Sequence, residues 1–388
     1  MSWLTRLGKI GALKWCVIIF SSVCIMGFLV VPALFLLGVY LTSGQEWTRN
    51  SSLPWPHKDE EGYFLAHKES GRWINYWSKG RPGFNSLLRF GLFEKDQSNI
   101  PSSEVLQSTL PVQKPNWSTP FRTVKATWLG HASVWVDFEG FSVLTDPIFS
   151  ERASPFSWSG PKRYRGAPCT ISELPGSLNA VVISHSHYDH CDLPSLIELS
   201  SRYGTKLHWF VPSGMKSWML DYVTGITENN VKEMEWWDEF EFQKGGFKII
   251  FTPSDHWSRR GAFDENKVLW GSWVIEGNGT RVFFGGDTAY NDEAFKQIKS
   301  KLGSIDLGLI PIGAYEPRWF MQYVHVNPEE AVKIHQDLGA KKSLGVHWGT
   351  FKLTYEPYLE PKSKIRELAT DQGLDFTTIN IGESLLYP

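Results

Sequence analysis

The chain has 388 residues, 42% of them hydrophobic and 21% charged, which is the composition of a folded protein and not of a disordered one. The formal net charge of −2 argues against a surface for polyanions, so we expect no nucleic acid partner. Four cysteines are too few to build a disulfide-stabilised scaffold.

The first predicted element along the chain is a membrane anchor. Residues 15–41 contain no charged side chain and are dense in Val, Ile, Leu and Phe, whereas about 20 apolar residues suffice to span a bilayer. Arg6, Lys9 and Lys14 precede this segment without an acidic residue among them, so the positive-inside rule favours a cytoplasmic N-terminus. The sequence therefore predicts a single-pass membrane protein with the bilayer as a partner.

Composition divides the chain into an N-terminal segment at 1–44, a lead-in at 45–120 and a main domain at 121–388. The lead-in is rich in Pro, Gly, Ser and Trp, and its part from 101 to 120 is predicted to be an extended linker. We expect the lead-in to pack onto the main domain through four aromatic side chains: Trp55, Trp73, Trp77 and Phe84.

Short strands and helices are predicted throughout the main domain. Strands are expected at 124–129, 133–138, 141–146, 178–184, 207–212, 306–313, 342–348 and 376–382, and hairpins at 240–253 and 271–288. Helices are expected at 192–203, with Asp192 as N-cap, and at 292–302, 327–339 and 361–373. The strands come first in hairpins and then alternate with helices. This order predicts an α+β fold of mixed sheets flanked by helices.

Three histidines and an aspartate crowd the end of one predicted strand. The apolar residues 181–183 are followed by His185, His187, Asp189 and His190. His and Asp are common ligands of Zn²⁺ and related ions, and four such side chains can serve two adjacent ions. A single histidine is more often a hydrogen-bonded core residue, but the density of this cluster favours a metal site.

Three further side chains of the same kinds stand at strand ends. His256 and Asp287 each follow the second strand of a predicted hairpin, and His347 closes the strand at 342–348. A carboxylate such as Asp287 can bridge two cations, because each of its oxygens can bind one. The pattern therefore predicts a site for two metal ions built from several strand ends.

These motifs carry a resemblance to the metallo-β-lactamase superfamily, and more narrowly to the N-acyl-phosphatidylethanolamine-hydrolysing phospholipase D family. The H-x-H-x-D-H string with the later His, Asp and His is typical of the superfamily. The narrower resemblance depends on longer stretches spread over most of 121–388. They are WLGHAS (128–133), GPKRYRGAPCTISELP (160–175), HSHYDHCDL (185–193), NKVLWGSW (266–273), GGDTAY (285–290), GAYEPRWFMQYVHVNPEEAVKIH (313–335) and VHWGTF (346–351).

The resemblance implies a fold and a metal centre. The fold is an αββα metallo-β-lactamase sandwich, with two mixed sheets face to face, helices outside and the site at one edge. The centre takes two Zn²⁺ per chain. The implied ligands are His185, His187 and His256 for one ion, Asp189, His190 and His347 for the other, and Asp287 as the bridge between them.

The resemblance also suggests roles in catalysis. Asp189 or Asp287 can accept the proton of the attacking water. His325 is a candidate for contacting the phosphate or protonating the leaving oxygen, although a structural role next to the ligands fits it nearly as well. His131 resembles a histidine that orients a metal ligand without binding the ion.

The substrate implied by the resemblance is a membrane phospholipid, N-acyl-phosphatidylethanolamine, cleaved to an N-acylethanolamine and phosphatidic acid. Arg259 and Arg260 are further candidates for meeting a phosphate, or surface salt-bridge partners. An aromatic stretch beside His325 can line a lipid groove, or it can be plain core. The implied substrate contacts are Arg318, Trp319, Phe320 and Tyr323.

Other functions remain open at this stage. The same metal site suits a lactone, a sugar-phosphate ester or a β-lactam. The net charge and the anchor argue against a nuclease, and seven candidate ligands argue against a purely structural zinc site, which normally closes with four. The sequence does not specify the oligomeric state, for which a homodimer is one expectation.

Overall fold

The computed structural model describes residues 57–77, 90, 94–120, 122–243 and 245–388. The predicted anchor at 15–41 lies outside the described residues, as do Trp55 and Phe84. Among the described residues, no helix is both long enough and apolar enough to cross a bilayer.

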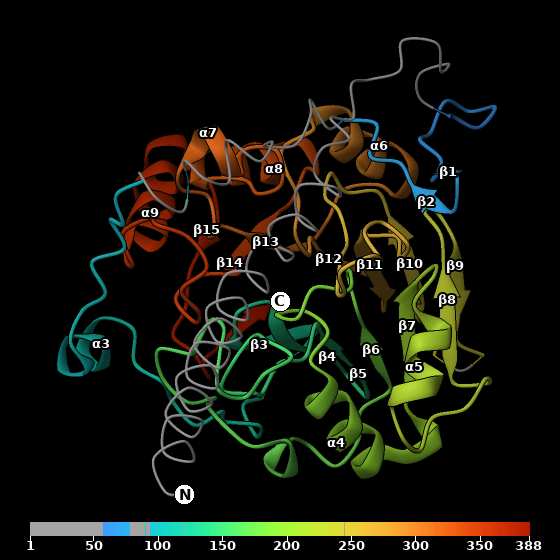
Figure 1. The fold of residues 1–388 in the computed structure, drawn as a ribbon, viewed down its shortest axis with the longest axis horizontal. Helices are drawn as coiled ribbons and strands as arrows, with labels where there is room; N and C mark the ends of the chain where they lie inside the picture. The colour runs from blue at the N-terminus through green and yellow to red at the C-terminus, as the bar shows by residue number, and fades with distance from the viewer. Residues whose placement is uncertain (1–56, 78–89, 91–93, 121, 244) are drawn as a thin grey trace, which may run out of the picture.

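Two seven-stranded sheets form the centre of the molecule (Figure 1). The first has the order β16-β3-β4-β5-β6-β7-β8, with the strands Ser384–Tyr387, Val124–Gly130, Ser133–Phe138, Phe141–Thr145, Ala180–Val182, His208–Pro212 and Val231–Met234. The second has the order β15-β14-β13-β12-β11-β10-β9, with the strands Phe376–Thr377, Lys342–Val346, Leu307–Pro311, Thr280–Phe284, Ser272–Gly277, Lys248–Thr252 and Glu239–Glu241. Both sheets mix parallel and antiparallel pairs, as expected.

Helices cover the outer faces of the two sheets, which completes the expected αββα sandwich (Figure 1). Helices α4 (Leu193–Tyr203) and α5 (Lys216–Tyr222) lie on the side of the first sheet. Helices α6 (Asp292–Leu302), α8 (Pro328–Asp337) and α9 (Glu360–Gln372) lie on the side of the second sheet. A single-turn helix, α7 (Arg318–Met321), follows β13.

Strand β4 shows how the sequence builds this sandwich. Val134 and Val136 belong to the core cluster between the sheets, whereas Trp135 belongs to a second cluster that contains Leu196 and Leu199 of α4. Successive side chains of a strand point to opposite faces, so a continuous apolar run can serve both clusters. Strands buried on both faces therefore read as unbroken hydrophobic stretches, in contrast to strands with one solvent-exposed face.

The strands that precede the candidate ligands all end at one edge. In the first sheet β3 and β5 flank the antiparallel β4 and therefore run in the same direction, and β6 is parallel to β5. In the second sheet β10 and β12 flank the antiparallel β11, and β13 and β14 continue parallel to β12. Loops that leave the C-terminal ends of these strands are thus brought to a common edge.

The prediction of an extended linker at 101–120 is wrong for part of this range. Helix α3 (Ser103–Thr109) forms there because Ser102 caps it by accepting a hydrogen bond from the Val105 amide, and Leu106 is buried in the main core. Further along, the Gln113 amide donates to the Ile381 carbonyl. The sequence signals for this helix are one leucine and one capping serine, and they are weak because they stand among Pro, Ser and Gln residues.

The described part of the lead-in at 57–77 packs on the main domain. It contains the short hairpin of β1 (Lys68–Glu69) and β2 (Arg72–Trp73). Trp73 is buried in the main core, and the Trp77 ring stacks on Trp236 with centroids 5.5 Å apart. The lead-in therefore contributes side chains to the same body that carries the candidate site.

Candidate metal centre

The candidate ligands lie in loops at the common edge of the two sheets. His131 directly follows β3, and the loop carrying His185, His187, Asp189 and His190 follows β6. The remaining candidates follow strands of the second sheet: His256 after β10, Asp287 after β12 and His347 after β14. Residues that stand more than 200 positions apart in the sequence thereby converge.

Four side chains form a first donor cluster: His185, His187, His256 and Asp287. His187 Nδ1 lies 2.7 Å from His185 Nε2 and 3.4 Å from His256 Nε2. Asp287 Oδ2 lies 3.8 Å from His185 Nε2 and 3.7 Å from His256 Nε2. These are the ligands expected for one ion together with the expected bridge.

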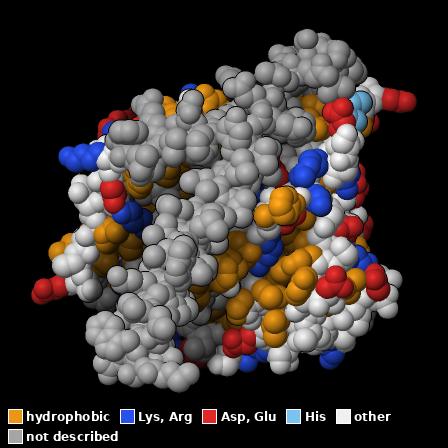
Figure 2. All heavy atoms as spheres, in the orientation of Figure 1, with side chains coloured by type: hydrophobic (Ala, Val, Ile, Leu, Met, Phe, Trp, Pro, Cys, Tyr) orange, Lys and Arg blue, Asp and Glu red, His pale blue; other side chains and the backbone are white. Residues whose placement is uncertain are grey.

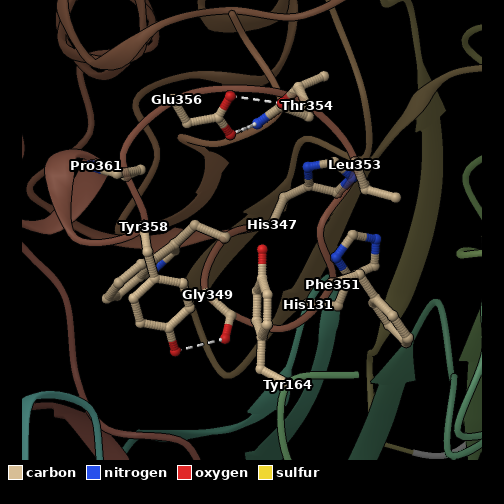
Figure 3. A pocket seen from close by; sticks show the side chains of 12 residues that line it. His131, Tyr164, His347, Gly349, Phe351, Leu353, Thr354, Glu356, Tyr358 and Pro361 are labelled. Atoms are coloured by element: carbon tan, nitrogen blue, oxygen red, sulfur yellow. Dashed lines mark hydrogen bonds between the residues drawn. The ribbon is translucent and has the colours of Figure 1, made fainter. Parts of the chain in front are cut away.

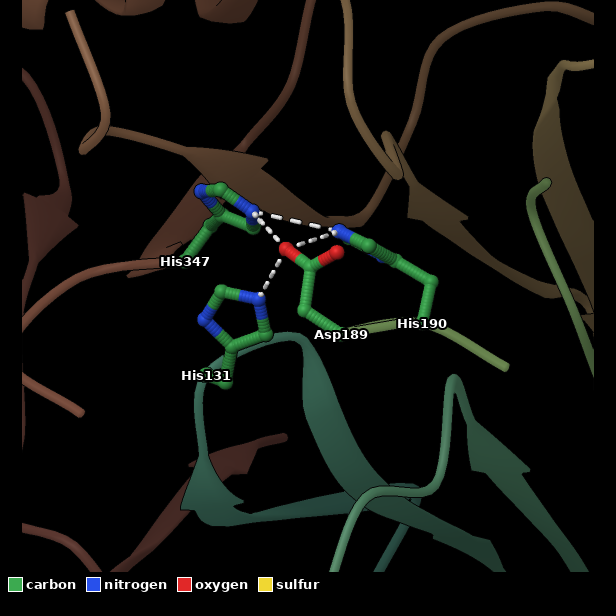
Figure 4. A group of neighbouring side chains, drawn as sticks. All are labelled: His131, Asp189, His190 and His347. Atoms are coloured by element: carbon green, nitrogen blue, oxygen red, sulfur yellow. Dashed lines mark hydrogen bonds and ion pairs between the residues drawn. The ribbon is translucent and has the colours of Figure 1, made fainter. Parts of the chain in front are cut away.

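A second donor cluster contains His131, Asp189, His190 and His347 (Figure 4). The Nε2 atoms of His190 and His347 lie 3.2 Å apart. Asp189 Oδ2 lies 3.3 Å from His190 Nε2, 3.6 Å from His347 Nε2 and 3.0 Å from His131 Nε2. Three of these four side chains are the ligands expected for the other ion, and His131 hydrogen-bonds the carboxylate of Asp189.

Asp287 lies between the two clusters. Its Oδ2 atom is 3.1 Å from His190 Nε2 and its Oδ1 atom is 3.0 Å from His347 Nε2, in addition to its contacts with the first cluster. The preceding Gly286 has φ +57, and a Cβ there would lie 2.5 Å from the Ser184 Cβ. The tight turn that presents Asp287 therefore requires glycine.

The donor separations fit metal ions. Two ligands on a tetrahedral ion at the usual Zn–N distance of about 2.0–2.1 Å are about 3.3–3.4 Å apart. The His187–His256, His190–His347 and Asp189–His190 separations are 3.4, 3.2 and 3.3 Å. The shorter His185–His187 distance of 2.7 Å suits an N–H···N hydrogen bond between the rings. Imidazole and carboxylate donors at these distances are suited to binding divalent cations.

Asp146 is a residue of the site that sequence reasoning missed. Its Oδ2 atom lies 2.6 Å from His190 Nδ1, and its two oxygens accept hydrogen bonds from the amide and hydroxyl of Ser184. Ser184 in turn lies 2.9 Å from His185 Nδ1. One buried carboxylate thus orients a candidate ligand of each ion. A signal existed, because Asp146 directly follows the apolar strand β5.

Asn75 from the lead-in supports the site from another side. Its amide group donates to Asp255 Oδ1 and to the His256 carbonyl, both at 2.7 Å. His256 Nδ1 lies 2.8 Å from the Val324 carbonyl, which leaves Nε2 for the first cluster. Sequence reasoning missed Asn75 because nothing in its local pattern distinguishes it from other polar residues of the lead-in.

The protonation states suit metal binding in the first cluster. Burial lowers the pKa of His187 to about 4 and that of His256 to about 3, so both rings are neutral at pH 7. Burial by itself raises the pKa of Asp287, but the neighbouring His190 and His347 outweigh it and hold this pKa well below its usual range. Neutral imidazoles and an ionised carboxylate are the forms that bind a cation.

The second cluster is charged in the absence of an ion. Burial lowers the pKa of His347, but Asp287 and Asp189 outweigh it and raise this pKa to about 9. The pKa of His190 is likewise raised well above its usual value by Asp287, Asp189 and Asp146 against the effect of burial. A cation that binds here must displace these protons, so binding is coupled to proton release.

His325 lies next to both clusters. Its Nδ1 atom is 3.9 Å from Asp287 Oδ2, and its ring stacks on His347 with centroids 5.5 Å apart. Burial lowers the pKa of His325 to about 3. Within the described residues, its Nδ1 atom has no hydrogen-bond partner. A neutral ring with an unused nitrogen beside the donor clusters is suited to a substrate contact.

The predicted substrate contacts have partners within the protein. Arg318 donates to the His325 carbonyl at 2.7 Å and pairs with Glu330 at 2.6 Å, so it braces the loop that carries His325. Trp319 Nε1 donates to Glu94 Oε1 at 2.8 Å, and Phe320 stacks on Phe90. Tyr323 is half-buried. Arg259 donates to carbonyls of its own loop, and Arg260 faces the ligand loop 185–191.

A small pocket of about 20 Å³ borders the second cluster (Figure 3). His131 and His347 line it together with Tyr164, Tyr358 and Glu356. A volume of this size holds a water molecule and not a phospholipid. The carboxylate of Glu356 accepts hydrogen bonds from the Ala314 and Glu316 amides, which ties this pocket wall to the loop after β13.

The fold and the donor clusters define a class of protein. A family model of the beta-lactamase superfamily domain matches residues 142–348. Among solved structures, the metallo hydrolase Igni18 from Ignicoccus hospitalis matches with a TM-score of 0.51 and 20% identity over 68% of this chain and 97% of that chain. An isothiocyanate hydrolase from Delia radicum gut bacteria matches with a TM-score of 0.51 and 17% identity over 68% of this chain and 99% of that chain. The chain is a metal-dependent hydrolase of the metallo-β-lactamase fold.

Two curated relatives narrow this class. The N-acyl-phosphatidylethanolamine-hydrolyzing phospholipase D 1 of Caenorhabditis elegans is 43% identical over 316 residues, which cover 78% of this chain and 88% of that protein. The mitochondrial N-acyl-phosphatidylethanolamine-hydrolyzing phospholipase D of Saccharomyces cerevisiae is 36% identical over 319 residues, which cover 72% of this chain and 66% of that protein. The chain belongs to the N-acyl-phosphatidylethanolamine-hydrolysing phospholipase D family.

Proposed function

We propose that the protein is a binuclear zinc phosphodiesterase of the phospholipase D type. It hydrolyses N-acyl-phosphatidylethanolamine to an N-acylethanolamine and phosphatidic acid. The family membership supports the substrate, because both curated relatives are named for this reaction. The chemistry of the donor set, in which imidazole nitrogens and carboxylate oxygens lie within 4.8 Å of one another in each cluster, supports zinc.

The observation that carries this proposal is the position of Asp287 between two donor clusters. His185, His187 and His256 would hold one ion, and Asp189, His190 and His347 would hold the other. Asp287 contributes one carboxylate to both sets. A structural zinc site closes with four ligands around one ion, so this shared arrangement favours catalysis.

The protein's own groups position the reactants and move protons. Two zinc ions bound in the site would supply a hydroxide at neutral pH and would stabilise charge on the phosphate oxygens. Asp189 or Asp287 accepts the proton of the attacking water, because both carboxylates are ionised. His325 is neutral at pH 7, and it donates an N–H hydrogen bond to a phosphate oxygen or to the departing oxygen. His131 holds the Asp189 carboxylate in place.

A lipid substrate requires contact with a bilayer. Hydrophobic side chains gather beside lysine and arginine side chains on the face of the molecule shown in Figure 2. We propose that residues 15–41, which lie outside the described residues, anchor the chain as a single span with a cytoplasmic N-terminus. The lack of charge over this segment supports the anchor. Domain limits of 1–44, 45–120 and 121–388 follow from the same division of the sequence.

Two measurements on the purified full chain test the chemistry. Metal analysis after zinc supplementation should give close to two ions per chain. Hydrolysis of N-acyl-phosphatidylethanolamine in ¹⁸O-labelled water should place the label in phosphatidic acid, because the water oxygen attacks phosphorus and the P–O bond to the N-acylethanolamine breaks. Label in the N-acylethanolamine, or turnover of a lactone without any phosphodiesterase activity, would contradict the proposal.

The anchor has a separate test. The full chain should stay in carbonate-washed membranes, and a chain lacking residues 1–44 should be released or held less tightly. Full-length protein that remains in solution without detergent would refute the anchor without affecting the chemistry. The expected homodimer is measured on the same detergent-solubilised protein by light scattering.

A further inference from the structure

Arg260 holds the ligand loop 185–191 at both of its ends. A single guanidinium nitrogen, Nη1, donates to the Cys191 carbonyl at 2.7 Å and to the Ser186 carbonyl at 3.2 Å. Between these two carbonyls stand His187, Asp189 and His190. The turn also has internal hydrogen bonds, because the amides of His190 and Cys191 both donate to the His187 carbonyl. Arg260 is thus the outer support of a turn that carries ligands of both clusters.

Aromatic rings fix the position of the Arg260 guanidinium. Its Cζ atom lies 4.2 Å from the centroid of the Tyr188 ring and 4.5 Å from that of the Trp218 ring. The Tyr188 hydroxyl donates back to the Arg260 carbonyl at 3.0 Å. Tyr188 belongs to the ligand loop and Trp218 to α5, so the arginine joins three separate segments. The planar guanidinium stacks on aromatic rings and donates hydrogen bonds at the same time, and lysine is a poor substitute for a group that must do both.

The loop that carries Arg260 is itself held in place. Asp264 Oδ1 accepts hydrogen bonds from the amides of Arg260 and Gly261 at 3.1 and 2.7 Å. Arg72 from the lead-in donates to the carbonyls of Phe263 and Glu265. The backbone that carries the guanidinium is therefore fixed by hydrogen bonds. A side chain can set the geometry of other residues only if its own position is fixed.

We propose that Arg260 is a positioning residue that holds the ligands of the two donor clusters at metal-binding distance by bracing the 185–191 turn from behind. Its link to catalysis rests on the proposed binuclear phosphodiesterase function. The hydrogen bonds of Arg260 lead to backbone carbonyls and not to the donor clusters. Arg260 therefore acts through His187, Asp189 and His190 and does not contact the phosphate.

The first test is local and needs neither metal nor activity. Hydrogen exchange of the His190 and Cys191 amides is compared in wild type, Arg260→Met and Arg259→Met, all as the full chain. Arg259→Met is a matched control, because it removes the neighbouring cation, whose hydrogen bonds within the described part of the chain go to the Gly261 and Ala262 carbonyls of its own loop. In Arg260→Met the two amides should exchange at least about tenfold faster, while the amides of β3 and β4 keep their wild-type rates.

The second test links the turn to the metal centre. Arg260→Met should bind zinc about 10–100-fold more weakly in competition with a chelator, as removal of an outer support of metal ligands usually does. With the centre saturated by zinc, kcat on a soluble phosphodiester should fall and KM should stay within about twofold, because Arg260 touches no substrate. Arg260→Lys keeps the charge and should give intermediate values in both tests; it also replaces Arg260→Met if that variant does not fold.

Several results would overturn the proposal. If the His190 and Cys191 amides of Arg260→Met exchange at wild-type rates, Arg260 does not support the turn. The same conclusion follows if Arg259→Met increases these exchange rates as much as Arg260→Met does. A uniform increase across both sheets would reduce Arg260 to a general contribution to stability. A rise in KM with unchanged kcat would make it a substrate contact. If the protein binds no second ion or does not cleave the phospholipid, the proposed function fails, whereas the exchange result still decides the role of Arg260.

Discussion

The Asp146 carboxylate lies 2.6 Å from Nδ1 of His190, while Nε2 of the same ring lies 3.2 Å from Nε2 of His347. An imidazole whose one nitrogen is held by a carboxylate presents the other nitrogen in a fixed direction. Both residues are fully buried, so water does not compete for this contact. Asp146 therefore sets the orientation of a candidate metal ligand.

Asp146→Asn should weaken zinc binding by about 10–100-fold, because the amide no longer supplies a charged acceptor to His190. The measurement is zinc competition with a chelator, followed by kcat at saturating zinc. Asp306→Asn is the control, because it removes another buried carboxylate outside the donor clusters. Asp306 directly precedes β13 and accepts a hydrogen bond from the Arg281 amide. Equal zinc affinity in wild type and Asp146→Asn would show that the contact is not needed for metal binding.

Asp287→Asn should lower kcat by more than about 100-fold while the fold survives, because the residue that joins the two donor clusters loses its charge. Metal analysis should show fewer than two tightly held ions, and circular dichroism should match the wild type. A variant that keeps near wild-type turnover would exclude Asp287 as the bridge.

Removal of metal should destabilise the protein as well as inactivate it. Ligands that bind only the folded state stabilise it by about 2.7 kcal/mol when their free concentration is 100 times Kd. Treatment with a chelator should therefore lower Tm, and zinc should restore both Tm and activity. Unchanged activity after complete chelation would refute a metal-dependent reaction.

The pH dependence of stability should differ between wild type and His325→Gln. In the metal-free protein burial keeps the pKa of His325 at about 3, whereas in the unfolded chain the pKa is near 6.5. Between these values only the unfolded state takes up the proton, so wild type loses stability as the pH falls. Each such group contributes about 1.4 kcal/mol per pH unit. In urea unfolding between pH 6 and 4, the free energy of unfolding of wild type should fall relative to that of the variant by about this amount per pH unit. If the free energies of the two proteins change with pH in parallel, the burial of His325 is contradicted.

Phe320→Ala should weaken activity on a long-chain phospholipid far more than on a short soluble phosphodiester. Hydrophobic burial contributes about 0.8 kcal/mol per CH₂, whereas the metal chemistry is common to both substrates. Trp319→Phe serves as the control, because it keeps an aromatic ring at the neighbouring position and removes the indole N–H that donates to Glu94. Equal losses on the two substrates would indicate that Phe320, which stacks on Phe90 with centroids 4.8 Å apart, is structural.

Local chemistry was enough to predict many elements and the kinds of ligand. Strand β4 and helix α6 have the predicted ends, because an apolar run that stops at the Glu139-Gly140 turn and a helix capped by Asn291 with acidic residues in its first turn are signals contained within a dozen residues. The hairpin of β11 and β12 turns at Asn278-Gly279, as two-residue turns of this type require. The crowded motif at 185–190 indicated metal ions for the same reason, since coordination depends on residue type.

The joining of distant segments was decided only by tertiary structure. Strand β16 at the C-terminus pairs with β3, and no local pattern predicts that partner. The contacts of His131 with Asp189, of Asp146 with His190 and of Arg260 with the ligand turn each link residues separated by tens of positions. A sequence shows which side chains can bind a metal or brace a loop. Which of them meet depends on how parallel strand ends are brought to one edge when two sheets pack together, and this is a property of the whole fold.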